Sequence, residues 1–166
     1  MTMENKPVVA VVMGSESDMK VMSVCIETLE DFAIKPVVRV ISAHRTPQIA
    51  AEFADTAAES GIKVIIAAAG MAAHLAGSLA GRTVLPVIGV PMDSGQALAG
   101  MDALLSTVQM PAGVPVATVA IGKAGARNAA ILAVQILAIS DENLTAKLED
   151  FKKQLRKKTV GKDSAI

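Results

Sequence analysis

Apolar residues along the chain follow two patterns that alternate. Short uninterrupted apolar runs, such as Val8 to Met13, are typical of strands buried on both faces of a parallel sheet. Apolar residues spaced three and four apart, such as Met22, Ile26 and Leu29, predict amphipathic helices. The predicted strands are residues 8–13, 35–41, 64–69, 84–90 and 116–121, and the predicted helices are residues 18–32, 47–60, 72–81, 101–109 and 124–139.

This alternation of strand and helix predicts the fold class. Strands buried on both faces need helices above and below them, and the crossovers between parallel strands are right-handed. We therefore expect an α/β three-layer sandwich with a central parallel sheet, of the flavodoxin-like kind. All 166 residues are predicted to form a single domain, 1–166, with its core at about residues 7–140.

The pattern changes after the last of these helices. Apolar residues separated by charged ones recur at spacings of four, three and four, which predicts an appended amphipathic C-terminal helix over about residues 142–158. These apolar residues are Leu144, Leu148, Phe151 and Leu155. Two interpretations stay open, because this helix either folds back on its own domain or clasps a neighbouring subunit. From Val160 onward we expect a frayed tail.

Composition and charge argue against several classes of partner and location. The 16 basic and 16 acidic side chains cancel, and aromatic residues make up only 2% with no Trp or Tyr, so we expect no nucleic acid partner. The single cysteine, Cys25, lies in an apolar helical pattern, which indicates a core residue in a reducing compartment. Because no signal peptide is visible before Pro7, we expect a cytoplasmic location.

One uncharged stretch, residues 64–81, is as long as a short membrane span. Its first part is β-branched and its second part is rich in Ala and Gly and contains His74. This composition predicts a buried strand, a loop and a tightly packed helix, so we expect no membrane span. Gly77 and Gly81 would let another backbone approach that helix, which also suits a subunit interface.

Three loops follow predicted strands and so meet at one edge of the sheet, where ligands bind in open α/β folds. They are residues 14–18, 42–47 and 69–75. In the first loop, Ser15 and Asp18 match a capping box, which predicts a structural helix cap. A glycine turn that leads into a helix is also typical of a phosphate site, in which Asp18 would hold a ribose diol.

The second and third loops each contain one of the two histidines. Thr46 followed by Pro47 predicts a capped helix start, which places His44 and Arg45 at the carboxyl end of a strand. His44 and Arg45 are either solvated or part of a site, and His74 is either a packing residue or a ligand. Two histidines with no acidic residue at ligand spacing do not make a zinc or iron set, so we expect no metal.

Seven motifs occur in a fixed order along the chain. They are Gly14-Ser-x-Ser-Asp18, Ser42-Ala-His-Arg-Thr-Pro47, Ala72-Ala-His-Leu75, Gly89-Val-Pro91, the run from Asp102 to Pro111, Pro115-Val-Ala-Thr118 and Asn128-Ala-Ala130. Together they resemble the N5-carboxyaminoimidazole ribonucleotide mutase family of de novo purine synthesis, over roughly residues 8–140. Members of this family move a carboxylate from the exocyclic amine to ring carbon C4, by transient decarboxylation and recarboxylation.

The resemblance implies a role for each candidate residue. His44 would be the catalytic residue, because an imidazole can act as both acid and base near neutral pH. The substrate-binding residues would be Ser15, Ser42 and Arg45 at the phosphate, Asp18 at the ribose, and Ala72, His74 and Leu75 at the carboxylate and ring. No cofactor or metal is implied. The implied partners are a small-molecule ribonucleotide substrate and further copies of the chain in a homo-octamer.

Two features favour a mutase over the related carboxylases that use dissolved carbon dioxide. Those carboxylases tend to carry Lys at the position of Arg45 and a different loop at residues 72–75. Three positions depart from the mutase pattern, since Ala68 and Met71 replace Gly and Ala76 replaces Pro. Met71 lies in the substrate loop, where its backbone conformation matters. A carboxylase and a non-catalytic nucleotide-phosphate binding module remain the alternatives.

Overall fold

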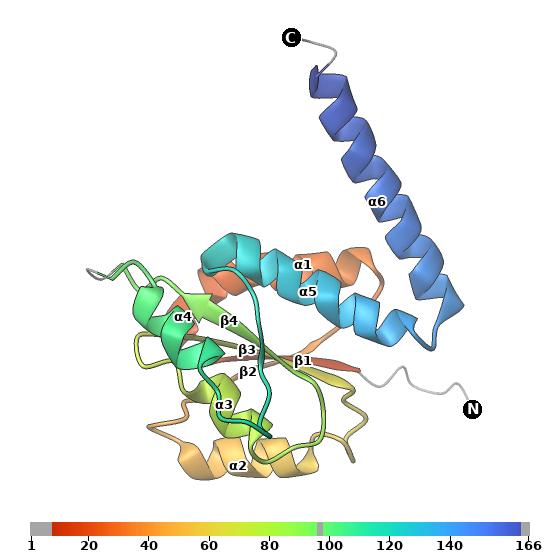
Figure 1. Ribbon diagram of the computed structural model, residues 1–166. Helices are drawn as coiled ribbons and strands as arrows, with labels where there is room; N and C mark the ends of the chain where they lie inside the picture. Colours follow the sequence, from red (N-terminus) through yellow and green to blue (C-terminus); the bar gives the residue numbers. More distant parts are fainter. Residues whose placement is uncertain (1–7, 96–97, 164–166) are drawn as a thin grey trace.

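Five parallel strands form one central sheet in the computed structural model, which describes residues 8–95 and 98–163 (Figure 1). The strands are β1 Val9–Met13, β2 Val37–Val40, β3 Val64–Gly70, β4 Val87–Met92 and β5 Ala117–Thr118. Their order is β2-β1-β3-β4-β5, and each neighbouring pair is parallel. Because β2 and β3 lie on opposite sides of β1, the strand order reverses beside β1, which creates a crevice at the carboxyl ends of β1 and β3.

Helices cover both faces of this sheet and confirm the predicted three-layer sandwich. They are η1 Glu16–Asp18, a short 3₁₀ helix, and α1 Met19–Asp31, α2 Pro47–Thr56, α3 Leu75–Ala80, α4 Met101–Val108, α5 Gly122–Ala138 and α6 Glu142–Asp163. Figure 1 shows α1 and α5 on one face of the sheet and α2 and α3 on the other. Successive residues of β1 alternate between these layers, since Val9 and Val11 join the α1 and α5 core while Ala10 and Val12 join the α2 and α3 core.

Several predicted boundaries were wrong by a few residues. α2 ends at Thr56 and not at residue 60, because the chain continues in turns as far as Gly61, whose φ is 94°. β4 begins after Pro86, which has no N–H for a strand ladder, and not at residue 84. α3 begins at Leu75 and not at residue 72, so the preceding loop is longer than predicted. β5 has two residues where six were predicted.

The C-terminal helix α6 packs on its own domain over its first half only. Leu144 is buried, and Phe151 meets Phe32 edge to face at 5.7 Å between ring centroids. Lys147 Nζ also donates a hydrogen bond to the Phe32 carbonyl oxygen at 2.9 Å. Beyond Phe151 the helix extends away from the domain (Figure 1), and Leu155 is 44% exposed. The expected fraying from Val160 onward was wrong for residues 160–163, which continue α6, while residues 164–166 lie outside the described residues.

The uncharged stretch forms regular elements of the fold, and the cysteine is buried in the core. Residues 64–81 form β3, a loop and α3, and no helix within the described residues is long and apolar enough to cross a membrane. Burial raises the pKa of the Cys25 thiol to about 12, so the thiol is an inert packing group. A Cβ atom on Gly77 would lie 2.8 Å from Sδ of Met110, so the space beside this glycine is filled by the chain itself.

Candidate active site

The three loops that follow β1, β2 and β3 line one pocket of about 480 Å³ at the carboxyl edge of the sheet. All eight residues expected at the site face this pocket, and they are Ser15, Asp18, Ser42, His44, Arg45, Ala72, His74 and Leu75. Residues up to 60 positions apart in the sequence are therefore brought together by the parallel order of three strands. The pocket lies where the reversal of strand order predicts a ligand.

The first loop turns from β1 into η1 and α1. The Gly14 N–H donates to the Ala68 carbonyl oxygen at 2.9 Å, which ties the loop to β3. Ser15 Oγ accepts hydrogen bonds from the Ser17 N–H at 3.3 Å and the Ser17 hydroxyl at 2.9 Å. The predicted helix cap is confirmed at η1, where the Ser15 side chain is the cap and the Asp18 carboxylate accepts a hydrogen bond from the Ser15 backbone. Ser15 caps η1, and the half-buried Asp18 carboxylate lines the pocket.

Burial raises the pKa of the Asp18 carboxyl above its ordinary value of 3.8, and a backbone hydrogen bond to Ser15 opposes this only in part. Asp18→Asn is therefore expected to stabilise the ligand-free protein slightly at pH 7, because the ionised carboxylate is less favourable in the folded than in the unfolded chain. The gain should shrink as the pH falls through the raised folded-state pKa, where wild-type Asp18 is protonated too. Thermal denaturation of both proteins between about pH 4 and pH 7 measures this, and a lower melting temperature for Asp18→Asn at pH 7 would contradict it.

The second loop is held closed by Ser42 and Thr46. Thr46 Oγ1 donates to the Ser42 carbonyl oxygen and accepts from the Ser42 N–H, both at 3.0 Å. The predicted capping by Thr46 is therefore wrong, although α2 does begin at Pro47. Ser42 Oγ accepts hydrogen bonds from the Arg45 backbone N–H at 3.1 Å and from Arg45 Nε at 3.4 Å, and an Arg45 terminal N–H reaches the Gly14 carbonyl oxygen at 3.2 Å. The guanidinium is thus positioned between the first and second loops.

The third loop contains a residue in a left-handed conformation. Met71 has a φ of 56°, a region that favours glycine, and its side chain is 57% exposed at the pocket. After Met71 the chain makes a tight turn, in which the His74 N–H donates to the Ala72 carbonyl oxygen at 2.8 Å. The His74 carbonyl oxygen then accepts from the Ser78 N–H at 2.9 Å. Methionine at this position thus keeps a backbone shape that glycine adopts without strain.

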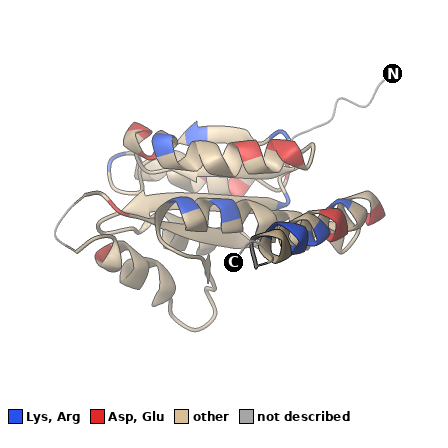
Figure 2. Cartoon of the chain, turned by 90° about the horizontal axis from the view of Figure 1, so that it is seen from above, with Lys and Arg blue, Asp and Glu red and all other residues tan. Residues whose placement is uncertain are grey.

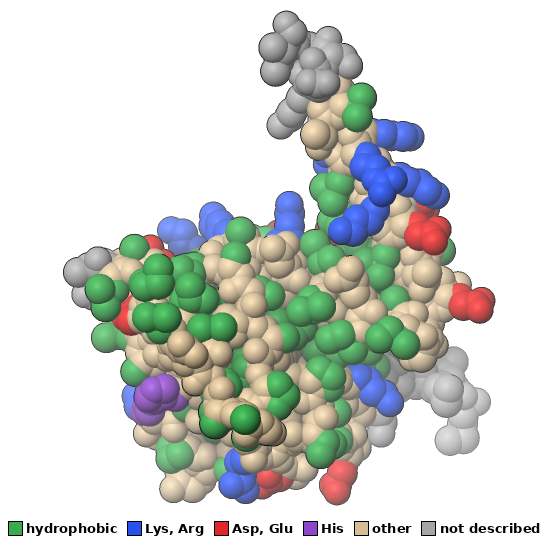
Figure 3. All heavy atoms as spheres, viewed as in Figure 1, with side chains coloured by type: hydrophobic (Ala, Val, Ile, Leu, Met, Phe, Trp, Pro, Cys, Tyr) green, Lys and Arg blue, Asp and Glu red, His purple; other side chains and the backbone are tan. Residues whose placement is uncertain are grey.

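The second and third loops bring the two histidines into direct contact. His44 Nε2 lies 2.7 Å from His74 Nδ1, and the rings meet at 80° with their centroids 4.9 Å apart. They form the single purple patch on the surface in Figure 3. No group of three or more His, Cys, Asp or Glu side chains suited to a metal ion occurs among the residues that the structure describes. The 2.7 Å separation of the two ring nitrogens is a hydrogen-bond distance.

Comparisons with known proteins show the family of the chain. A family model described as AIR carboxylase matches residues 8–158. The chain belongs to the AIR carboxylase family. It is 54% identical over 155 residues to the N5-carboxyaminoimidazole ribonucleotide mutase of Bacillus subtilis (strain 168), covering 93% of this chain and 94% of the relative. It is 53% identical over 154 residues to the protein of the same name from Escherichia coli (strain K12), covering 92% and 90% respectively.

Two solved structures share the fold. The crystal structure of Treponema denticola PurE matches with a TM-score of 0.85 and 28% sequence identity, covering 95% of this chain and 97% of that chain. A crystal structure of a variant of Treponema denticola PurE2 matches with a TM-score of 0.87 and 27% identity, covering 97% and 98%. The sheet and the helices on both its faces are thus shared with these two structures.

Two serines line the pocket that were not among the residues expected from the sequence. Ser17 lies in the first loop, and Ser94 follows β4. Ser94 Oγ occupies the space that a Cβ atom on Gly70 would need, which brings the segment after β4 into the pocket. The signal was present, because the segment after a fourth parallel strand reaches the same edge of the sheet as the other three.

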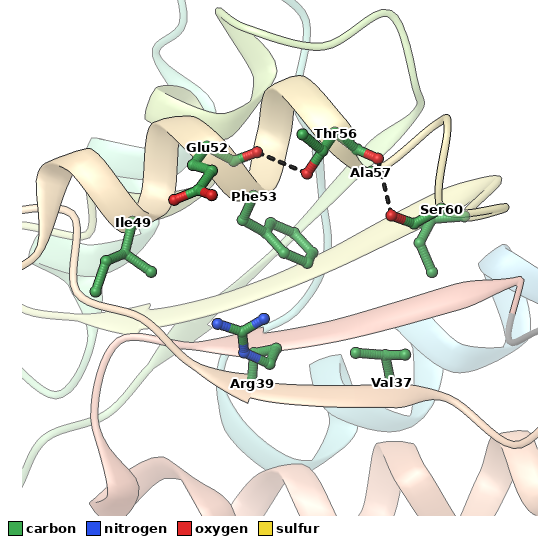
Figure 4. Close-up of a pocket in the computed structure, with 9 residues that line it drawn as sticks. Val37, Arg39, Ile49, Glu52, Phe53, Thr56, Ala57 and Ser60 are labelled. Atoms are coloured by element: carbon green, nitrogen blue, oxygen red, sulfur yellow. Dashed lines mark hydrogen bonds between the residues drawn. The ribbon is translucent and has the colours of Figure 1, made fainter.

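A second hollow of about 320 Å³ lies between the edge strand β2 and α2 (Figure 4). There the Arg39 guanidinium lies 5.9 Å from the centre of the Phe53 ring. The hydroxyls of Thr56 and Ser60 donate to backbone carbonyl oxygens one turn earlier. These polar groups are used within the fold, and none of the eight expected site residues lines this hollow. The pocket that contains the histidines is therefore the candidate site.

Proposed function

We propose that this chain is a mutase that converts N5-carboxyaminoimidazole ribonucleotide into 4-carboxy-5-aminoimidazole ribonucleotide in de novo purine biosynthesis. Curated relatives with this name are 52 to 54% identical to it over 85% or more of either chain. The observation that carries the proposal is the single pocket that gathers His44, Arg45, Asp18 and His74 from three loops. Its small size and its charged groups suit a ribonucleotide monophosphate.

His44 is the catalytic residue in this proposal. The reaction breaks the bond between carbon and the exocyclic nitrogen, releases carbon dioxide, and forms a new bond from ring carbon C4 to that carbon. One proton is delivered to the amine and one is removed from C4, so one group that gives and then takes a proton is sufficient. Imidazole performs both steps near neutral pH, and the loop that carries His44 is held by the Ser42 and Thr46 hydrogen bonds.

The remaining expected residues bind the substrate. Ser15, Ser42 and the Arg45 guanidinium bind the phosphate, because hydroxyls and a charged fork of N–H donors match its oxygens. Asp18 accepts hydrogen bonds from the ribose hydroxyls. Ala72, His74 and Leu75 line the carboxylate and ring end, where backbone N–H groups and an imidazole can hold an anion. No metal ion or cofactor takes part, and the proposed location is the cytoplasm.

The activity is tested with the carbamate substrate and the purified protein. Formation of the C4 carboxylate is followed in its ultraviolet absorbance, with an enzyme-free sample that measures spontaneous breakdown of the carbamate. We expect product formation that is proportional to the protein concentration. A rate equal to that of the enzyme-free sample would overturn the proposed function and leave the binding-module alternative.

We also propose a homo-octamer. The outer half of α6 supports it, because this half extends beyond its own domain with charged side chains along its length (Figures 1 and 2) and Leu155 44% exposed. α4 supports it as well, since Met101, Leu105 and Val108 form a half-exposed apolar stripe at helical spacing.

Light scattering is expected to give a mass eight times the 17.1 kDa of the chain. Leu155→Glu should shift the mass downward, because a charge would be buried at a subunit contact, whereas Leu155→Met should leave it unchanged. A monomer at micromolar concentration would contradict the octamer. Equal masses for both Leu155 variants and the wild type would remove α6 from the interface.

A further inference from the structure

The contact between the two histidines constrains their protonation. His44 Nε2 and His74 Nδ1 are 2.7 Å apart, a distance that requires a hydrogen bond between them. Such a bond needs one proton, because two N–H groups would repel each other and two bare nitrogens have no proton to share. The pair therefore holds a single proton between its inner nitrogens, and the outer nitrogens are His44 Nδ1 and His74 Nε2.

The position of this proton decides what the outer nitrogen of His44 can do. When the proton is on His44 Nε2, a neutral His44 has a bare Nδ1 and can act as a base. When the proton is on His74 Nδ1, a neutral His44 carries its own proton on Nδ1 and can act as an acid. The mutase reaction needs both states of one residue in succession. A movement of the shared proton switches between them without any movement of a ring.

The surrounding structure keeps the two rings in place. The loop of His44 is closed by the hydrogen bonds between Ser42 and Thr46, and the His74 backbone is bonded on both sides, to Ala72 and Ser78. The other charged side chains that line the pocket are Asp18 and Arg45. The Arg45 guanidinium is directed to Gly14 and Ser42, and the Asp18 carboxylate accepts a hydrogen bond from the Ser15 backbone. In the described part of the chain, His74 is thus the side chain that is bonded to the His44 ring.

We propose that His74 is a positioning residue that fixes the tautomer of His44 and gives and takes back the shared proton while His44 exchanges its Nδ1 proton with the substrate. The proposal rests on the proposed mutase function for its reaction, although the histidine pair itself can be observed without substrate. The two ring nitrogens of His74 then have different roles. Nδ1 serves His44, and Nε2 remains for the substrate.

The protons balance over one turnover. At the start His74 is an imidazolium and His44 is neutral, with its proton on Nδ1. His44 gives this proton to the exocyclic nitrogen as the carbon–nitrogen bond breaks, its electron pair stays on nitrogen and carbon dioxide leaves. The shared proton moves at the same time from His74 Nδ1 to His44 Nε2, so that both rings are neutral.

The second half of the turnover reverses this transfer. Ring carbon C4 attacks carbon dioxide, and the bare His44 Nδ1 then removes the proton from C4, whose electron pair returns to the ring. The shared proton moves back from His44 Nε2 to His74 Nδ1. The pair ends with the protons that it had at the start, and no other acid or base is needed.

The first test observes the pair in the free protein. The chain has only two histidines, so ring nitrogen-15 spectra of the labelled protein contain two sets of signals. We expect His44 Nε2 and His74 Nδ1 to have shifts of hydrogen-bonded nitrogens that change together when the pH is varied. In His74→Asn the remaining His44 should show a different tautomer balance. Two rings that titrate independently, with His44 unchanged in His74→Asn, would overturn the pair whatever the activity.

The second test uses turnover and chemical rescue. An Asn side chain places an amide near the position of Nδ1 but cannot carry the shared proton. We therefore expect His74→Asn and His74→Leu to lower kcat alike, by about tenfold or more, which is the scale on which a partner orients and tunes a functional histidine. Retention of wild-type kcat in His74→Asn would show a purely structural role and overturn the proposal.

Added imidazole should restore kcat to His74→Gly, because it fits the vacated space and carries a proton near neutral pH. Pyrazole has nearly the same shape but is not protonated there, so it serves as the matched control and should not rescue. Equal rescue by both compounds would mean that only the space is needed, which overturns the proposal. If the wild type itself has no mutase activity, the proposed function fails, while the nitrogen-15 spectra still decide whether the pair exists.

Discussion

His44→Asn is expected to abolish turnover while the affinity for the nucleotide falls little. Asparagine has a similar size and keeps some hydrogen bonding, but it cannot give or take a proton at neutral pH. Loss of a general acid and base costs about 10² to 10⁴-fold in rate. The rate is measured with the carbamate substrate, and the affinity by calorimetry with the C4 carboxylate product.

Arg45→Ala is the matched comparison, because it changes the neighbouring residue in the same loop. Its guanidinium bonds Gly14 and Ser42 and is proposed to hold the phosphate. We expect the Arg45→Ala substitution to weaken nucleotide binding by about 1.5 to 3 kcal/mol, which is the cost of a lost charged hydrogen bond. Its effect on kcat should be smaller. Near-normal turnover in His44→Asn would contradict the prediction and move the acid and base role to His74.

Most of the label in the carbamate carboxylate is expected to remain in the product. Substrate labelled with carbon-13 in this group is turned over in unlabelled bicarbonate, and the product is analysed by mass spectrometry. In a mutase the released carbon dioxide stays in a pocket that excludes water and is captured again before it escapes. A carboxylase that draws on the dissolved pool would give product without the label.

The experiment needs short times and a pH at which the carbamate breaks down slowly, because label lost before binding would imitate a carboxylase. Met71→Gly is the informative variant. Since Met71 already has a φ of 56°, glycine leaves the loop in its shape and removes only the side chain at the pocket. We expect the variant to retain label as the wild type does. Loss of label in the wild type, with these controls in place, would contradict the mutase and favour the carboxylase.

The order of the elements could be predicted because it depends on local periodicity. Continuous apolar runs such as β3, and apolar spacings of three and four as in α1, reflect which faces are buried. The ends of elements were less well predicted, because they depend on contacts between distant segments. Thr46 is an example, since its hydroxyl bonds Ser42 and not the free N–H groups of α2.

The sequence by itself determined the parallel α/β fold, the three loops and the eight residues that line one pocket, because in a parallel sheet every loop that follows a strand lies at the same edge. Only the tertiary structure decided how those residues act on each other. The 2.7 Å bond between His44 and His74 joins residues 30 positions apart, and the raised pKa of Asp18 depends on burial by its neighbours. Distances and solvation of this kind depend on how separate loops pack, and no local pattern in the sequence records them.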